Sequence, residues 1–323
     1  MALIQFPNIR IGHATDLNGP TGCTVILCPQ GAVAGIDIRG SASGTRQTDS
    51  LFSLHRVPQI HGLLLSGGSA FGLDAAGGVM QYLEEKGIGF DVQITRVPII
   101  PTAILFDLSL GDPFRRPDKA MGYQACLNAQ ADEVAEGSVG AGTGASVGKL
   151  FGITQATKGG LGYASVRTEG GLTVAALVVV NAFGDILDEH GKILAGARSS
   201  PSADTFAGTW EYFKRGSIPT HFVVLNNTTL GVILTNARLN PYQVRKLAQM
   251  GQNALVRCIA PVHTLFDGDT IFSLSLGDLE ADLNQIGVLA QEMVQEAVIR
   301  AISHADGLGL IPAWKDLSGN NQP

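Results

Sequence analysis

Six short runs of apolar residues constrain the fold of this chain more than any other feature. The runs are residues 23–28, 62–66, 172–181, 221–226, 230–236 and 271–277. Several are continuously apolar, which is typical of strands that are covered on both faces. Helical spacing of apolar residues predicts three helices, over 72–86, 241–256 and 280–303. Together these elements predict an α/β protein built as a layered sandwich.

Composition supports a folded protein with a large core. Of the 323 residues, 45% are hydrophobic and only 15% are charged, which excludes intrinsic disorder. The chain also holds 41 glycines without a three-residue period, so it is not collagen-like. Tight turns, or backbone lying close to a ligand, would both need such an excess. Length alone is compatible with about two domains or with one large α/β domain.

Charge, cysteines and apolar segments exclude several classes of protein. The formal net charge of −6 disfavours a nucleic-acid partner. The N-terminus does not resemble a signal peptide, and the apolar run 173–183 is interrupted by Asn181 and is too short to span a membrane. We therefore expect a cytoplasmic protein that does not act at a membrane. Four cysteines without CxxC or zinc-type spacing predict buried, reduced thiols and no metal site.

Two glycine-rich motifs do not match the sites that they resemble. In GAGTGASVGK (140–149), Thr143 stands where a phosphate-binding loop needs glycine, and Leu150 replaces the magnesium-binding Ser or Thr. No buried strand precedes Gly140, so the dinucleotide fingerprint fails as well. In LLLSGGSAFG (63–72), Phe71 replaces the last glycine of a nucleophile elbow around Ser69. The sequence therefore predicts no nucleotide and no other cofactor.

The segment Asn226-Asn227-Thr228-Thr229 lies between two of the apolar runs and allows two interpretations. In the simpler interpretation, the segment is a hairpin turn, because asparagine tolerates a left-handed backbone conformation. β-Branched threonines are poor residues for such a turn. In the second interpretation, the protein itself cuts the peptide bond between Asn227 and Thr228. Thr228 then becomes an N-terminal residue whose amine, with a pKa of about 8, can take the proton of its own hydroxyl.

Segments along nearly the whole chain resemble one family, that of self-cleaving L-aminopeptidase/D-esterases, β-aminopeptidases and nylon-oligomer hydrolases. They are RIGHATD (10–16), GCTVIL (22–27), RGSASGTRQTDSL (39–51), residues 63–85, VPIIPTAILFDL (97–108), EGSVGAGTGASVGK (136–149), VVNAFGDI (179–186), NNTTLGV (226–232) and DGD (267–269). The resemblance implies a four-layer αββα sandwich, related to N-terminal-nucleophile hydrolases but connected differently. It also implies one domain over 1–323, cut into chains 1–227 and 228–323. It further implies a homotetramer that hydrolyses small amides, peptides or esters.

The resemblance assigns the site residues by position. Thr228 is the nucleophile, first toward the bond after Asn227 and later toward substrate. Asn181 is the side chain that stabilises an oxyanion, and Lys149 lies near the nucleophile, as in the nylon-hydrolase branch. Asp267 and Asp269 match the acidic pair of that branch, one orienting Thr228 and the other behind it. Without the resemblance, Lys149 would be interpreted as a solvated surface residue and Asn181 as the cap of a strand end. The acidic pair would be interpreted as part of a simple turn.

Two departures bear on the substrate. Aminopeptidase members carry Glu-x-Tyr near TAILFDL, where the glutamate binds the substrate ammonium, whereas this chain has Ile104 and Phe106. We therefore expect an amide hydrolase closer to the nylon-oligomer branch than to strict aminopeptidases. Two alternatives remain. One is an acyltransferase like the ornithine acetyltransferases, whose Ala-Thr-Met-Leu pattern is not matched at 227–230. The other is a non-catalytic binding or assembly protein of the same fold.

Overall fold

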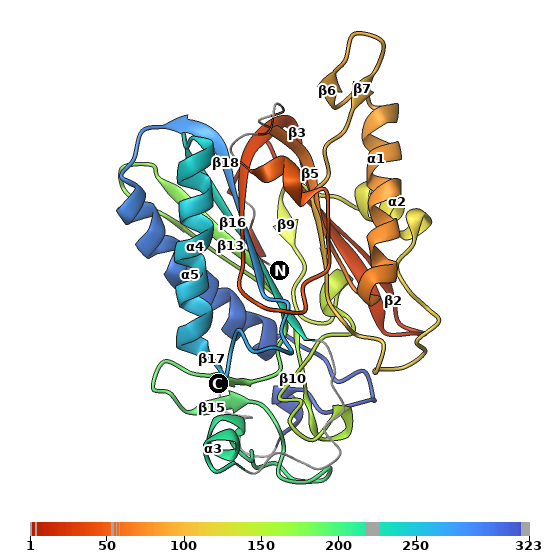
Figure 1. The fold of residues 1–323 in the computed structure, drawn as a ribbon, viewed down its shortest axis with the longest axis vertical. Helices are drawn as coiled ribbons and strands as arrows, with labels where there is room; N and C mark the ends of the chain where they lie inside the picture. The colour runs from red at the N-terminus through yellow and green to blue at the C-terminus, as the bar shows by residue number, and fades with distance from the viewer. Residues whose placement is uncertain are drawn as a thin grey trace.

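A long, bent strand connects the two halves of the main sheet. The computed structural model describes residues 2–3, 5–52, 55, 57, 59–216 and 227–317, and in this part of the chain the main sheet has nine strands (Figure 1). Their order is β12 (Gly160–Arg167), β13 (Thr173–Asn181), β16 (Thr228–Ala237), β18 (Thr270–Leu279), β3 (Thr21–Ile38), β5 (Gln59–Ser66), β8 (Thr102–Ile104) and β4 (Thr45–Arg46), with β2 (Arg10–Asp16) also on β3. The end of β3 pairs with β18, and its beginning pairs with β2 and β5. β3 therefore belongs to both halves.

Three separate apolar cores show that the halves face each other. Alternate residues of β13 point to opposite sides: Val174, Ala176 and Val178 join the core under α4 (Pro241–Cys258) and α5 (Leu283–Ser303). Leu177 and Val179 join a second core, shared with residues of β3 and β5. A third core packs β3 and β5 against α1 (Ala75–Glu85) and α2 (Lys119–Leu127). The layers are thus helix, sheet, sheet and helix, as the resemblance implies, within a mixed α+β fold.

Most predicted elements are confirmed with shifted ends. The apolar runs lie in β3, β5, β13, β16 and β18, except 221–226, which falls outside the described residues. The helix expected from residue 72 begins at Ala75, because a 3₁₀ turn over Ser69–Asp74 precedes it. Asn240 caps α4 as predicted: its side chain accepts from the Gln243 N–H at 2.9 Å, and the Gln243 side chain accepts from the Asn240 N–H.

Short elements complete the described chain. They are α3 (Thr209–Lys214) and the strands β1 (Ala2–Leu3), β6 (Phe90–Asp91), β7 (Arg96–Val97), β9 (Glu133–Val134), β10 (Ser146–Val147), β11 (Thr157–Lys158), β14 (Asp185–Leu187), β15 (Ile193–Ala195) and β17 (Ile259–Ala260). No helix of this part of the chain is long and apolar enough to cross a bilayer. All four cysteines are buried and unpaired, as predicted.

Glycines allow helices and strands to touch through their backbones. At the crossing of α1 and α2, a Cβ on Gly78 would lie 1.9 Å from the Lys119 carbonyl oxygen. On β12, a Cβ on Gly162 would lie 2.0 Å from the Ala297 carbonyl oxygen of α5. Side chains at these positions would force the layers apart. Much of the glycine excess therefore serves close packing between layers.

Neighbouring glycines of α1 provide a direct test of this packing. We expect Gly78→Ala to lower the free energy of unfolding by about 1–3 kcal/mol, because the new methyl group meets backbone of α2. Gly77→Ala is the matched control, since its Cβ would lie 3.8 Å from the nearest atom, in the Lys119 side chain. That change should stabilise the helix by up to about 1 kcal/mol. Chemical denaturation measures both; equal effects would contradict the packing argument.

Candidate active site

Thr228 and Asn181 face each other at the ends of two neighbouring strands. Thr228 is the first residue of β16 and pairs with Asn181, the last residue of β13, in antiparallel register. Both side chains are buried, at 2% and 0% exposure. Thr228 and Thr229 thus lie in a strand, where β-branched residues fit well, and the hairpin interpretation does not hold for them.

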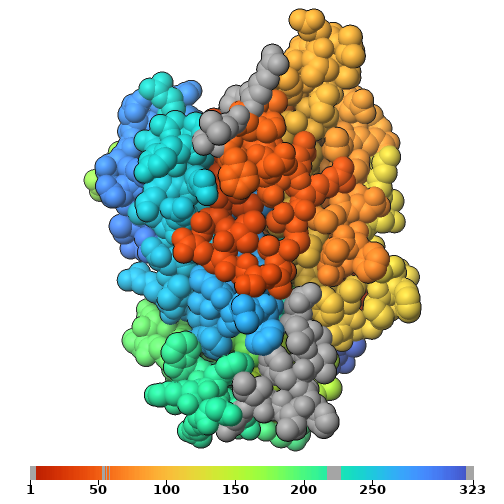
Figure 2. All heavy atoms as spheres, in the orientation of Figure 1, coloured from red at the N-terminus to blue at the C-terminus, as the bar shows by residue number. Residues whose placement is uncertain are grey.

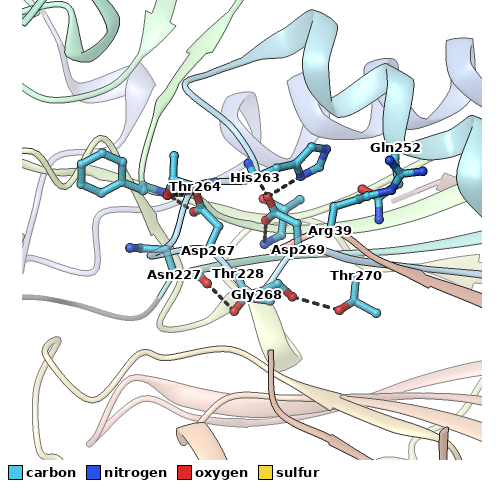
Figure 3. Close-up of polar contacts among 12 residues, drawn as sticks. Arg39, Asn227, Thr228, Gln252, His263, Thr264, Asp267, Gly268, Asp269 and Thr270 are labelled. Carbon is cyan, nitrogen blue, oxygen red and sulfur yellow. Dashed lines mark hydrogen bonds and ion pairs between the residues drawn. The ribbon is translucent and has the colours of Figure 1, made fainter. Parts of the chain in front are cut away.

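The peptide group between Asn227 and Thr228 is tightly held. The Thr228 hydroxyl donates to the Asn227 carbonyl oxygen at 2.5 Å, and the Gly268 N–H donates to the same oxygen at 2.6 Å (Figure 3). The Asn227 N–H donates to the Phe266 carbonyl oxygen at 2.7 Å. Asn227 thereby forms a parallel β-bridge with Asp267. The hydroxyl of Thr228 lies beside a carbonyl that two donors polarise.

Lys149 binds the side chain of Asn181. The Lys149 ammonium donates to Asn181 Oδ1 at 2.6 Å and to its backbone oxygen at 3.3 Å, and the Ser146 N–H also donates to Oδ1. Asn181 Nδ2 donates to the Phe106 carbonyl oxygen at 3.0 Å. The Oδ1 end of the Asn181 amide therefore faces Lys149, and the Nδ2 end faces Phe106. The glycine-rich loop before Lys149 thus delivers it to the residue that pairs with Thr228.

Burial changes the protonation of this lysine. Lys149 is 4% exposed, and loss of hydration lowers the pKa of its ammonium to about 7. The negative charges of Asp267 and Asp107 oppose that shift, and the positive charge of Lys158 adds to it. Near neutral pH a substantial share of Lys149 is therefore a neutral amine, which can accept a proton.

Asp267 and Asp269 lie together beside Thr228 (Figure 3). Asp269 Oδ1 accepts from the Thr229 N–H at 2.8 Å, and Asp267 Oδ2 accepts from the Thr264 hydroxyl at 2.5 Å. Burial, and next the charge of Asp269, raise the pKa of Asp267 to about 6. Among the described residues, neither carboxylate bonds to the Thr228 hydroxyl. The Asp269 carboxylate thus holds the backbone that follows Thr228, and the Asp267 carboxylate holds Thr264 and the Phe183 N–H.

Ile104 and Phe106 come close to the site in different ways. Ile104 is buried at the end of β8, where its N–H donates to the Gly44 carbonyl oxygen. Phe106 is half-buried and contacts Asn181 through its backbone carbonyl. Neither position supplies a charged group to the site.

Three further polar residues were not singled out from the sequence as parts of this site. His263 contacts Asp269 Oδ2 through Nδ1 at 3.0 Å. Asp107 is buried and accepts from the Gly68 N–H and the Thr21 hydroxyl, both at 2.7 Å, and burial raises its pKa to about 6. Lys158 is completely buried and donates to the carbonyl oxygens of Gly142, Ala145 and Gly159. Asp107 lies within the resembling segment 97–108 and His263 lies four residues before the segment 267–269, whereas no pattern marks Lys158.

The fold is shared with solved aminopeptidase structures. The β-aminopeptidase of Burkholderia sp. aligns with a TM-score of 0.72 over 98% of this chain and 90% of that chain, at 20% identity. The L-aminopeptidase D-Ala-esterase/amidase of Ochrobactrum anthropi, described as a variant of the Ntn-hydrolase fold, aligns with a TM-score of 0.69 over 93% of this chain and 85% of that chain, also at 20% identity. The architecture is therefore that of Ntn-hydrolase-like aminopeptidases.

Sequence relatives define the family. The model of peptidase family S58 matches residues 2–310. An uncharacterized aminopeptidase of Mycobacterium leprae is 38% identical over 97% of this chain and 93% of its own length. A 6-aminohexanoate-oligomer endohydrolase of Agromyces sp. is 30% identical over 93% of this chain and 86% of its own length. The chain belongs to peptidase family S58 and is a hydrolase of peptide or amide bonds.

Proposed function

We propose that this S58 peptidase cuts its own chain between Asn227 and Thr228 and then uses Thr228 as an N-terminal nucleophile. The observation that supports the proposal is the Thr228 hydroxyl, 2.5 Å from the carbonyl oxygen of the bond to be cut. That carbonyl also accepts from the Gly268 N–H, a donor of the kind that stabilises an oxyanion. The alternative of a non-catalytic protein is not compatible with the family.

The proposed self-cleavage has two steps, formation of an ester and its hydrolysis. Thr228 Oγ1 attacks the Asn227 carbonyl carbon, an ester bond forms, and the peptide C–N bond breaks. The hydroxyl proton ends on the released nitrogen of Thr228. Water then hydrolyses the ester, which leaves a carboxylate on Asn227 and restores the hydroxyl of Thr228. The products are chains 1–227 and 228–323.

Lys149 is the proposed base of the first step. Before cleavage the nitrogen of Thr228 is an amide and cannot accept the hydroxyl proton. The oxygens of Asp267 and Asp269 already accept hydrogen bonds from Thr264, His263 and backbone N–H groups. Lys149, with a pKa of about 7, is held against Asn181 opposite Thr228. Its neutral amine is the proposed acceptor of the hydroxyl proton.

The same residues support turnover. After cleavage the α-amine of Thr228, with a pKa of about 8, takes the hydroxyl proton, and the substrate acyl group becomes an ester on Oγ1. One N–H of Asn181 Nδ2 binds the Phe106 carbonyl; the other has no partner among the described residues and is the proposed donor to the oxyanion. Removing such a donor costs about 10²–10³ in rate in other enzymes.

Substrates of this proposal are small linear amides and peptides. Relatives are named as aminopeptidases and as 6-aminohexanoate-oligomer endohydrolases, which favours an open-chain amide. As the family resemblance implies, we further propose a homotetramer of cut units in the cytoplasm.

Denaturing electrophoresis of the purified protein tests self-cleavage. We expect two bands in place of one after incubation, and N-terminal sequencing of the smaller fragment should read Thr-Thr-Leu-Gly, from Thr228. Mass spectrometry of the intact fragments identifies the bond that is cut. A chain that stays whole while it hydrolyses amides would contradict the proposal.

A further inference from the structure

Asn181 is held by two separate stretches of backbone. Its Nδ2 donates to the Phe106 carbonyl oxygen at 3.0 Å, and its Oδ1 accepts from the Ser146 N–H at 3.1 Å. The same Oδ1 accepts from the Lys149 ammonium at 2.6 Å. The direction of this amide, and with it the place of Lys149, therefore depends on where residues 106 and 146 hold their backbone groups.

Asp107 is a buried residue that packs against both stretches. It follows Phe106 directly in the chain, and it is 3% exposed. The glycine-rich loop lies against it: a Cβ on Gly144, two residues before Ser146, would lie 2.5 Å from Asp107 Cβ. On the carboxylate itself, a Cβ on Gly67 would lie 2.2 Å from Asp107 Oδ2. Packing as close as this leaves the side chain one place to lie.

Two hydrogen bonds fix the carboxylate in that place. Asp107 Oδ1 accepts from the Gly68 N–H and Oδ2 accepts from the Thr21 hydroxyl, both at 2.7 Å. A buried carboxylate needs such donors, because burial without them is costly. Thr21 begins β3 and Gly68 lies in the turn after β5. Asp107 thus ties the segment with the Phe106 carbonyl to two strands of the main sheet.

We propose that Asp107 is a positioning residue that holds the amide of Asn181, and through it Lys149, in place beside Thr228. It does so through the Phe106 carbonyl on one side and the 144–146 loop on the other. This inference rests on the proposed function, in which Asn181 and Lys149 take part. Asp107 itself forms no bond to the reacting groups and carries no proton in either step.

The acidic pair is held by different contacts. The Ala42 N–H donates to the Asp267 carbonyl oxygen at 2.9 Å, and Figure 2 shows the segment after β3 packed against the segment before β18. His263 Nδ1 contacts Asp269 Oδ2 at 3.0 Å. None of these contacts includes Asp107. Removing its carboxylate should therefore disturb the other side of the site and leave the acidic pair in place.

A double-mutant cycle separates positioning from a general loss of structure. Asp107→Ala should slow the disappearance of full-length protein about ten- to a hundredfold. In an Asn181→Ala background the same change should slow it by less than about twofold, because the residue through which Asp107 acts is gone. In a His263→Ala background the full slowing should remain. Equal slowing in all three backgrounds would overturn the proposal.

The charge of Asp107 provides a second readout. Burial lowers the pKa of the Lys149 ammonium to about 7; the charges of Asp267 and Asp107 oppose that shift, and the charge of Lys158 adds to it. Asp107→Asn keeps the shape of the side chain and both hydrogen bonds, since its amide oxygen accepts from the backbone N–H and its nitrogen donates to the threonine hydroxyl. Without the negative charge the pKa of Lys149 falls, so the rise in the rate of self-cleavage should move to a lower pH. A rise at an unchanged pH would overturn the proposal.

A milder variant keeps the test decisive if Asp107→Ala does not fold or Asn181→Ala is never cut. Thr21→Val removes one of the two donors to the carboxylate and changes the shape of residue 21 little. On the cut protein it should lower kcat for a p-nitroanilide about two- to tenfold, with KM unchanged. Asp107→Asn, which keeps both bonds, should lose less in kcat than Thr21→Val. A normal kcat in Thr21→Val would overturn the proposal.

Failure of the proposed function gives different results. A Thr228→Ala protein that remains active, or an Asn181→Ala protein that is cut and hydrolyses amides normally, would overturn the roles of those two residues. If both variants lose activity while the Asp107 and Thr21 variants behave as the unaltered protein, only the role of Asp107 is overturned.

Discussion

Replacing Thr228 by alanine is expected to keep the chain at full length and to lower amide hydrolysis by about 10³ or more. The change removes the hydroxyl that donates to the Asn227 carbonyl oxygen at 2.5 Å. Without it neither ester forms, and the α-amine of residue 228 is never released. Electrophoresis and an anilide assay on the same preparation measure both effects.

Two variants serve as controls for this prediction. Thr228→Ser retains a hydroxyl and should still be cut. Thr229→Val removes the neighbouring buried hydroxyl, which has no hydrogen-bond partner among the described residues, and keeps the backbone N–H that Asp269 binds. It should be cut and active. If the full-length Thr228→Ala protein hydrolysed amides at the normal rate, the nucleophile would have to be a residue other than Thr228.

Replacing Lys149 by methionine is expected to slow self-cleavage by about 10²–10⁴, the usual contribution of a general base. The pH dependence follows from the lowered pKa. Below about 7 the ammonium form dominates and cannot accept a proton, so the rate of self-cleavage in the unaltered protein should rise as pH increases through about 7. Lys149→Met should lose this rise. The measurement is the rate at which full-length protein disappears across pH.

Lys158 offers a matched control, because burial lowers the pKa of its ammonium to about 7 as well. Its Nζ donates to three backbone carbonyls, whereas the Nζ of Lys149 donates to Asn181. Lys158→Met should lower stability by about 1–3 kcal/mol, since carbonyls lose their donor. It should keep a rise in rate with pH, moved to a higher pH because the positive charge of Lys158 no longer lowers the pKa of Lys149. If only this variant lost the rise, Lys158 rather than Lys149 would be the group that titrates.

The sequence alone predicts the individual strands and helices. It does not predict the contacts between segments that are far apart in the chain. The apolar runs 172–181 and 271–277 predict β13 and β18, and Asn240 is predicted as a helix cap, because these signals are local. The bridge between Asn227 and Asp267 joins positions far apart in the chain, so no local pattern encodes it. Lys158 precedes two glycines and looks like a loop residue, yet it is completely buried. The resemblance supplied Lys149 and Asn181, and only the structure shows how they touch.

The position of β16 has a consequence for the protein once the proposed cut between Asn227 and Thr228 has been made. This strand begins at Thr228 and lies between β13, which belongs to the first fragment, and β18, which belongs to the second. β18 in turn pairs with β3 of the first fragment. The fragments should therefore stay together without a covalent link. Once unfolded, however, they must meet again in solution, so refolding becomes bimolecular and depends on concentration. The proposed cut would thus make the protein's lifetime depend on how slowly it unfolds.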